Sequence, residues 1–153
     1  MTEILIGIDV GTTNTKVIAV DAAGQEVAKA IQPTPIDPSI ESTTSPLYDA
    51  YAIWKVCTQL LKQVMAQLKS SHQVAALAIT SMGEAGVLID KNGKPLLPVL
   101  TWHDKRTTPY KEWWQNQLQA LDLYQITGLP FDYIYSVNKI LWYRDHYPEA
   151  FSQ

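Results

Sequence analysis

The sequence predicts an α/β fold, and three features predict it. Apolar, β-type runs at residues 4–10, 17–21 and 26–31 are separated by turn sequences, which indicates a three-stranded meander. Apolar residues then recur at three- and four-residue steps from Ile53 to Leu68, as they do along one face of a helix. A further apolar run follows at residues 74–80, and a strand–helix–strand order favours parallel pairing with a right-handed crossover.

The first strand is predicted to be buried on both faces. Ile4, Ile6 and Ile8 alternate with Leu5 and Gly7, so nearly every side chain in the run is apolar. A carboxylate at the end of such a strand, Asp9, is costly unless something pairs with it. Hydrated Mg²⁺ is a natural partner, because it binds through one or two carboxylates and keeps positions for water and phosphate oxygens.

The turn after this strand has the composition of an anion-binding loop. Gly11 lets the backbone approach a ligand closely, and Thr12 and Thr13 supply hydroxyls. Consecutive N–H groups in a turn can cradle an anion. We interpret the loop as a nucleotide-phosphate site; a plain hairpin turn is the alternative, since Gly-Thr-Thr-Asn also suits a turn.

A long helix is predicted after a Pro-rich break and a polar loop that ends at Pro46. Asp49 is predicted to be its N-cap. Its apolar stripe must pack on a sheet, and Cys57 on that stripe is interpreted as a core residue rather than a nucleophile. The stripe comprises Ile53, Val56, Cys57, Leu60, Leu61, Val64, Met65 and Leu68.

The second half of the chain predicts a buried strand at 74–80, a hairpin and two helices. Residues 86–90 and 95–101 are predicted strands around a strong turn at 91–94. Thr108 is predicted to cap a helix that has Pro109 at its first position and runs to about Leu121. The last predicted helix covers about 136–146, before Pro148.

Composition limits the partners and the compartment. The chain has 153 residues, 46% apolar and 18% charged, as in a globular protein. Its net charge of −3 gives no electrostatic reason to expect nucleic acid. The lone Cys57 excludes an intrachain disulfide, and no apolar run approaches the roughly 20 residues that span a membrane. The N-terminus shows no signal peptide, so we expect a cytoplasmic protein without membrane partners.

Two groups of motifs carry a resemblance to known proteins. The pattern Asp9-x-Gly11-Thr12-Thr13-x-x-Lys16, at the first turn of a meander, resembles the first phosphate motif of the ribonuclease-H-like (actin-like ATPase) fold. Heat-shock ATPase chaperones open in a similar way. The later segments of the chain resemble the FGGY carbohydrate kinases instead, in matching order: residues 79–84, the turn at 90–95, and residues 102–106, 128–130, 139–143 and 146–151.

The resemblance implies an ATP-dependent kinase that phosphorylates a hydroxyl of a sugar, sugar acid or polyol. Such kinases have two lobes, and residues 1–153 resemble an incomplete N-terminal lobe with a phosphate hairpin at 4–21 and sugar-contact segments at 80–90 and 100–108. The catalytic base belongs to the C-terminal lobe of the same protein. We therefore expect no catalytic residue here and no turnover by this piece alone. Homodimer formation through exposed strand edges is left open.

The resemblance also implies roles for the phosphate hairpin. Asp9 would hold Mg²⁺ through water, and Lys16 matches the basic position beside the transferring group. The alternative for Lys16 is a solvated lysine at a strand edge. The remaining residues would face the β- and γ-phosphates of ATP: Gly11, Thr12, Thr13 and Asn14.

Glu84 matches the glutamate with which glycerol kinases bind substrate hydroxyls. Gly83 departs from that pattern, because those kinases have an arginine there, and the Met-His pair of xylulose kinases is also missing. The absent side chain would enlarge the pocket or leave room for another segment. An aldonic acid such as gluconate is a second substrate class, alongside ketoses and polyols.

The segment 102–106 matches the Trp-x-Asp-x-Arg pattern of the family. The Trp102 indole would stack on the apolar face of a sugar, and the Asp104 carboxylate would accept hydrogen bonds from the sugar hydroxyls. Core packing is the alternative for Trp102, and an ion pair with Asp104 is the alternative to ligand contact for Arg106. His103 is interpreted as a flanking residue. The segment argues against the competing interpretation, a chaperone or cytoskeletal-type ATPase module whose nucleotide state controls partner binding.

Overall fold

The computed structural model describes residues 1–37, 47–118 and 120–152. The chain divides into two compact units: Met1–Ile36 with Tyr48–Met82, and Asp37–Leu47 with Gly83–Gln153. Most of the polar loop predicted before Asp49, residues 38–46, lies outside the described residues.

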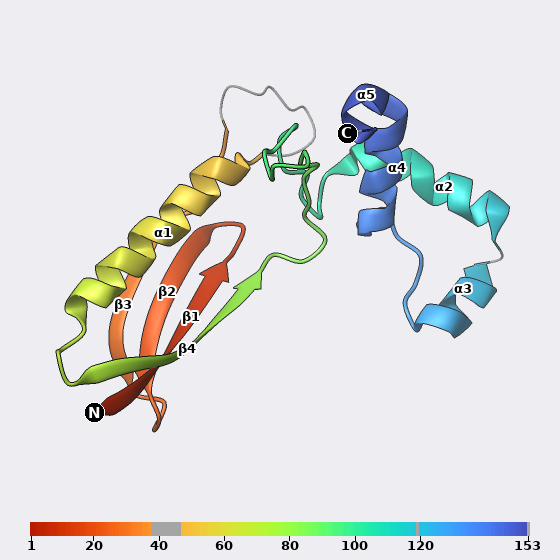
Figure 1. Cartoon of the computed structure of the whole chain (residues 1–153). Coiled ribbons are helices and arrows are strands. Elements are labelled where there is room, and N and C mark those ends of the chain that lie inside the picture. The colour runs from red at the N-terminus through yellow and green to blue at the C-terminus, as the bar shows by residue number, and fades with distance from the viewer. Residues whose placement is uncertain (38–46, 119, 153) are drawn as a thin grey trace. The chain divides into compact units, whose positions relative to one another are not determined.

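The first unit is built on a four-stranded sheet in the order β3-β2-β1-β4 (Figure 1). Its strands are β1 (Thr2–Val10), β2 (Asn14–Asp21), β3 (Glu26–Pro33) and β4 (His72–Ser81). The predicted antiparallel meander is confirmed, and so is the parallel pairing of β4 with β1.

The helix α1 (Ala50–Gln67) covers one face of this sheet (Figure 1). Asp49 is its N-cap, as predicted: Oδ1 accepts a hydrogen bond from the Tyr51 N–H at 2.7 Å, which satisfies one of the free donors of the first turn. Each large apolar side chain buried between helix and sheet contributes roughly 1.5–3 kcal/mol. The core comprises Ile4, Ile6, Ile8, Val17, Ala19, Ala28 and Ala30 of the sheet with Val56, Leu60 and Val64 of α1.

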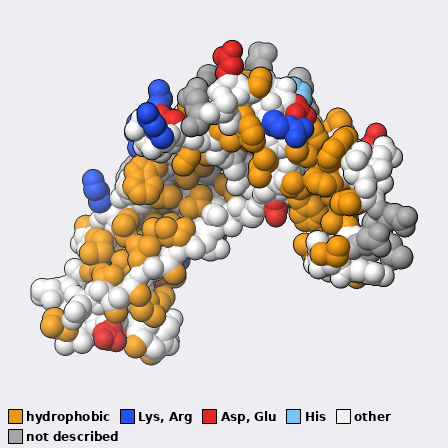
Figure 2. Space-filling model, turned by 45° about the vertical axis from the view of Figure 1, so that its right-hand side comes forward, with side chains coloured by type: hydrophobic (Ala, Val, Ile, Leu, Met, Phe, Trp, Pro, Cys, Tyr) orange, Lys and Arg blue, Asp and Glu red, His pale blue; other side chains and the backbone are white. Residues whose placement is uncertain are grey.

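The strand β4 is exposed along nearly its whole length, which corrects the prediction of a buried strand at 74–80. Leu77 is 45% exposed and Ile79 is 66% exposed, because α1 packs mainly on β2 and β3. An apolar groove of about 370 Å³ remains between β4 and the helix, with Trp54 and Leu61 among its lining residues. Hydrophobic side chains accordingly gather on the molecular surface (Figure 2).

The strand β1 is buried on one face only, which corrects a second prediction. Ile4, Ile6 and Ile8 lie in the core, whereas Leu5, on the opposite face, is exposed. No helix in the described part of the chain combines the length and apolar character needed to cross a membrane.

In the second unit, the predicted turn at 91–94 forms. Asp90 Oδ1 accepts hydrogen bonds from the N–H groups of Asn92 and Lys94, both at 2.8 Å, and Gly93 has a φ of 79°. These bonds hold the pKa of the Asp90 carboxyl below its usual range, with Lys94 making the largest contribution.

The predicted strands around this turn do not form. Residues 86–90 and 95–101 make isolated bridges, Gly86 with Leu100 and Ile89 with Pro95. The Ile89–Pro95 bridge needs no N–H from Pro95, because it is held by the bonds beside it, from Asp90 N–H to Lys94 O and from Leu96 N–H to Leu88 O, both at 2.9 Å. In the same register Gly86 would face Pro98, which has no N–H to donate, and Gly86 pairs with Leu100 instead.

The rest of this unit is helical: a 3₁₀ turn η1 (Lys105–Thr107), α2 (Thr108–Gln117), α3 (Ala120–Thr127), α4 (Ser136–His146) and α5 (Pro148–Phe151). The prediction for α4 is confirmed. The prediction for α2 is corrected at both ends, since Thr107 is its N-cap and it ends at Gln117. The hydroxyl of Thr108 donates instead to the Lys105 carbonyl at 2.7 Å. α3 and α5 have no counterpart in the sequence prediction.

A small core holds this unit together. Leu47, Leu100 and Tyr143 are buried in it, and Leu88, Leu97 and Trp142 pack against them. The Tyr143 hydroxyl donates toward the carbonyls of Pro98 at 3.0 Å and Gly86 at 3.3 Å, so it ties α4 to the irregular segment.

Candidate functional site

The predicted phosphate hairpin is the turn between β1 and β2. Asp9 and Lys16 are direct cross-strand partners, and Asp9 Oδ2 lies 3.5 Å from Lys16 Nζ. The Asp9 side chain is 46% exposed, which corrects the expectation that a carboxylate at this strand end is buried. Lys16 is exposed to a similar degree and provides a counter-charge without desolvation.

The turn requires glycine at position 11, because the backbone of Asn14 lies close to it. A Cβ at this position would lie 2.9 Å from the Asn14 carbonyl oxygen, a distance that a side chain cannot tolerate. The Gly11 N–H donates to the same oxygen at 3.0 Å, which closes the turn. The Gly11 N–H is therefore used by the fold and is not available to a ligand.

Three successive carbonyls of the loop accept hydrogen bonds from the first unit. Gly11 O accepts from the Thr34 hydroxyl at 2.7 Å, and Thr13 O accepts from the Thr34 N–H at 3.0 Å. Thr12 O, between them, accepts from the Tyr48 hydroxyl at 2.9 Å. No sequence signal pointed to Thr34 or Tyr48, because both lie outside the loop motif.

The residues of the hairpin fit a hydrated magnesium ion. Among the described residues, no group of three or more His, Cys, Asp or Glu side chains could hold a metal ion directly. Mg²⁺ needs only one or two carboxylates when water and phosphate oxygens complete its shell. Asp9 is accessible for that purpose and lines an open pocket of about 390 Å³ together with Lys16 and Thr80.

Glu84, the first predicted substrate residue, lies in the turn at 83–84 after β4. Its φ of 54° is in the left-handed region, which costs a non-glycine residue roughly 1–2 kcal/mol. Its carboxylate oxygen Oε2 accepts hydrogen bonds from the backbone N–H and, at 2.6 Å, the hydroxyl of Ser136, at the start of α4. A carboxylate is favourable there because the helix dipole is positive at its N-terminus. A Cβ on the neighbouring Gly83 would meet no atom within 4 Å, so the missing side chain leaves open space.

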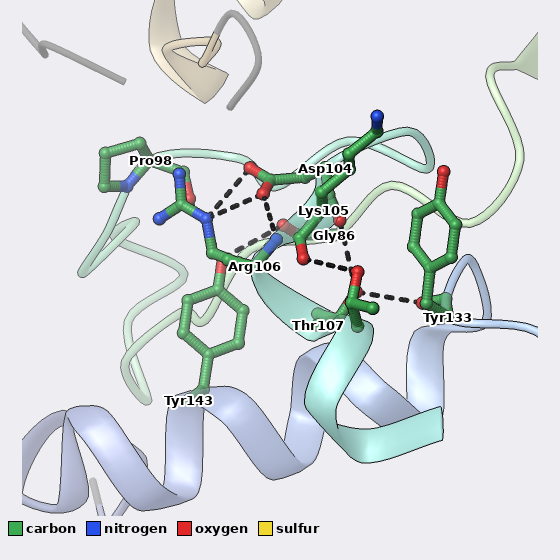
Figure 3. A network of polar contacts seen from close by, with 9 residues as sticks. Gly86, Pro98, Asp104, Lys105, Arg106, Thr107, Tyr133 and Tyr143 are labelled. Carbon is green, nitrogen blue, oxygen red and sulfur yellow. Dashed lines mark hydrogen bonds and ion pairs between the residues drawn. The ribbon is translucent and has the colours of Figure 1, made fainter. Parts of the chain in front are cut away.

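Asp104 and Arg106 form the buried polar contact of this unit (Figure 3). Arg106 Nε lies 2.9 Å from both carboxylate oxygens of Asp104, and the Arg106 N–H donates to Oδ1 at 3.0 Å. The Asp104 side chain has no exposed surface, whereas that of Arg106 is 21% exposed. The guanidinium carbon also lies 4.9 Å from the ring centroid of Trp142. The ion pair considered for Arg106 is thus present in the structure.

The neighbouring Thr107 continues this network. Its buried hydroxyl lies 3.1 Å from the Asp104 carbonyl and 2.9 Å from the Tyr133 carbonyl (Figure 3). Trp102, by contrast, is 44% exposed and packs edge-on against His103. The segment 102–106 therefore presents one aromatic face from a firmly held turn.

One face of α4 carries functional candidates that the sequence motifs did not indicate. Lys139 is buried and its Nζ donates to the Ile134 carbonyl at 2.5 Å. Burial lowers the pKa of Lys139, and the nearby carboxylates of Glu84 and Asp104 oppose that shift. Burial raises the pKa of Tyr143, which stays a donor at neutral pH. Ser136, Lys139 and Tyr143 recur at three- and four-residue steps, a polar stripe that periodicity could have revealed.

The structure thus groups the predicted residues in two sets. Asp9, Gly11, Thr12, Thr13, Asn14 and Lys16 belong to the first unit, and Gly83, Glu84, Trp102, Asp104 and Arg106 belong to the second. Among the described residues, buried polar atoms without a hydrogen-bond partner include Thr101 Oγ1, His103 Nδ1 and Asn138 Oδ1, all in the second unit.

Comparison with known proteins finds one family. Residues 4–153 match the N-terminal domain of the FGGY family of carbohydrate kinases. An L-fuculokinase from Haemophilus influenzae is 30% identical over 149 residues, which cover 95% of this chain and 32% of the relative. A glycerol kinase from Janthinobacterium is 33% identical over 153 residues, covering 98% of this chain and 30% of the relative.

A solved structure confirms the fold. The glycerol kinase of Plasmodium falciparum, crystallised with ADP, superposes with a TM-score of 0.86 at 24% identity, over 97% of this chain and 30% of that one. This likeness confirms the predicted α/β, actin-like ATPase fold. The chain spans about a third of the length of the curated relatives that it matches.

Proposed function

Since this chain belongs to the FGGY family of carbohydrate kinases, we propose that it forms the front part of the N-terminal lobe of an ATP-dependent kinase. The acceptor is a hydroxyl of a sugar, sugar acid or polyol. A C-terminal lobe of the same protein supplies the adenine pocket and the catalytic base, so the 153-residue chain alone is inactive. The observation that carries the proposal is the accessible carboxylate–lysine pair beside a glycine-tightened loop.

The phosphate hairpin positions ATP and neutralises its charge. Phosphoryl transfer needs little covalent help from the protein, so positioning and electrostatics supply most of the acceleration. Magnesium, when bound, neutralises the phosphate oxygens, and Asp9 holds its water shell. The residues that follow Gly11 face the β- and γ-phosphates: Thr12, Thr13 and Asn14. Lys16 leaves its weak ion pair with Asp9 and pairs instead with the phosphoryl group that is transferred.

Glu84 and Trp102 contact the acceptor. Ser136 engages Oε2 of Glu84, while Oε1 has no hydrogen-bond partner among the described residues and can accept a substrate hydroxyl. The exposed indole of Trp102 suits the apolar face of a sugar. Asp104 is fully buried, so in this proposal it acts with Arg106 to hold the turn that presents Trp102. Direct contact of Asp104 with the acceptor requires that turn to open, whereas the Arg106 side chain is 21% exposed.

The relatives support acceptors of the kind that their names state, and L-fuculose and glycerol are the first two to test. Gluconate represents the alternative class, an aldonic acid. The open space beside Gly83 allows an acceptor larger than glycerol. The competing interpretation as a chaperone-type ATPase module finds no support in these matches.

The test uses the full-length protein with an Asp9→Asn substitution. We expect kcat to fall by about 10²–10³-fold, while the acceptor Kd measured by calorimetry stays within about twofold. Asp21→Asn, a carboxylate at the far end of β2 that accepts two turn N–H bonds, is the matched control and should turn over normally. Wild-type turnover of Asp9→Asn would remove Asp9 from the metal role. Failure of the wild type to phosphorylate any of the three acceptors would defeat the proposal.

A further inference from the structure

The loop between β1 and β2 is held by residues far from it in sequence. The three carbonyls of Gly11, Thr12 and Thr13 all accept hydrogen bonds, from Thr34 just after β3 and from Tyr48 just before α1. These contacts bridge long sequence separations, 23 residues for the Thr34 hydroxyl and 36 for Tyr48. Two separate segments therefore hold the carbonyls of the loop.

This anchoring sets the direction of the loop N–H groups. In a trans peptide the carbonyl of one residue and the N–H of the next point in opposite directions, and the described residues contain no cis peptide bond. The carbonyls of Gly11 and Thr12 point to Thr34 and Tyr48, so the N–H groups of Thr12 and Thr13 point away from them. Neither of these N–H groups has a hydrogen-bond partner among the described residues. Two adjacent donors that the fold leaves unpaired suit an anion.

The anchoring residues are themselves fixed. Tyr48 and Thr34 are buried, at 2% and 4% exposure. Thr34 Oγ1 lies 3.0 Å from Oγ1 of Thr15, which is fully buried in β2. Burial also raises the pKa of Tyr48, so its hydroxyl keeps the proton that it donates. A donor held in this way fixes the loop more firmly than an exposed side chain could, because its rotamer is set by packing.

We propose that Thr34 and Tyr48 are positioning residues for the phosphate loop. They hold the carbonyl side of the loop against the first unit, which turns the N–H groups of Thr12 and Thr13 toward the β- and γ-phosphates of the nucleotide. The inference rests on the proposed function for the identity of the ligand. It adds that nucleotide affinity depends on two residues outside the loop motif.

The kinetic test compares the KM for ATP with the KM for the acceptor. In the full-length protein, Tyr48→Phe and Thr34→Val should each raise KM for ATP about tenfold and leave KM for the acceptor unchanged. The reason is that loss of one hydrogen bond to a loop carbonyl lets the N–H groups of the loop change direction. Thr34→Ser keeps the hydroxyl and should restore wild-type KM for ATP. Tyr51→Phe, three residues along at the exposed start of α1, is the matched control. Unchanged KM for ATP in Tyr48→Phe, or an equal rise in both KM values, would overturn the inference.

A second measurement on the 153-residue chain distinguishes this inference from the proposed function. The ¹⁵N amide resonances of Thr12 and Thr13 should shift in Tyr48→Phe and stay in place in Tyr51→Phe, without any ligand. If the resonances shift in Tyr48→Phe but the full-length wild type phosphorylates no acceptor, the proposed function is refuted and the anchoring by Tyr48 still holds. Active wild-type protein with unmoved resonances in Tyr48→Phe would refute the anchoring alone.

Discussion

Replacing Asp104 by Asn should cost this chain about 3 kcal/mol of unfolding free energy. Removing one partner of a buried ion pair typically costs about 3–5 kcal/mol, since the remaining charge stays buried without its counter-charge. Asp104 is fully buried, which favours the upper end of that range. Arg106 is 21% exposed and lies over Trp142, so water and the indole compensate part of the loss and favour the lower end.

Urea unfolding followed by tryptophan fluorescence is the assay. Trp102, Trp113, Trp114 and Trp142 lie in the second unit and only Trp54 lies in the first, so the signal reports mainly the unit that contains the substitution. With an m value of about 2 kcal/mol/M, the midpoint should fall by about 1.5 M urea.

Asp132→Asn supplies the matched control in the same unit. It removes the charge from an exposed pair with Lys111, 4.0 Å long, where the side chains of Asp132 and Lys111 are 40% and 38% exposed. Such pairs contribute about 0–1 kcal/mol, so the midpoint should hardly move. If Asp104→Asn lost no more stability than Asp132→Asn, the ion pair with Arg106 would not hold the 102–106 turn and the reasoning would fail.

Three further predictions concern other parts of the structure. Tyr143→Phe should lower stability by about 1–3 kcal/mol in the same urea assay, because the Pro98 carbonyl would lose the Tyr143 hydroxyl that donates to it at 3.0 Å; an unchanged midpoint would contradict this. Ile79→Lys should change stability by less than about 0.5 kcal/mol, since the side chain is exposed, and should reduce self-association measured by light scattering; undiminished scattering would count against an apolar contact through β4. Hydrogen bonds, chiefly from Arg144, lower the pKa of Asp145 in the folded state, so its contribution to stability is complete above about pH 3.9 and is lost as pH falls through the folded pKa. The melting-temperature gap between wild type and Asp145→Asn should therefore shrink on acidification, and a constant gap would refute the assignment.

Features that depend on neighbouring residues could be predicted from the sequence. The hairpin, the Asp49 cap and the bounds of α4 are local, because each is set by turn residues, a capping side chain or a short periodic pattern. The exposure of β4 could not be predicted. An apolar run such as 74–80 shows that burial would be favourable, but the sequence does not say which element covers it, and α1 packs on β2 and β3 instead.

The same distinction applies to the candidate site. The candidate residues of the loop are contiguous in sequence, so composition alone identifies Asp9 and Thr12 as candidates. The groups that hold them, such as Tyr48, come from distant segments, and one sequence carries no record of that contact. The strands predicted around the 91–94 turn are a different case, because pairing in the register of the Ile89–Pro95 bridge would require an N–H from Pro98 opposite Gly86, which proline lacks.

The division of the chain into units has a consequence for its synthesis on the ribosome. The first unit is interrupted in sequence, because Asp37 and Leu47 belong with residues after 82. Leu47 finds its core partners Leu100 and Tyr143 only after those residues have been made. At about 5–20 residues per second, Tyr143 is translated roughly 5–20 s after Leu47. During that interval the sheet of the first unit can fold while Leu47 still lacks the partners of its core.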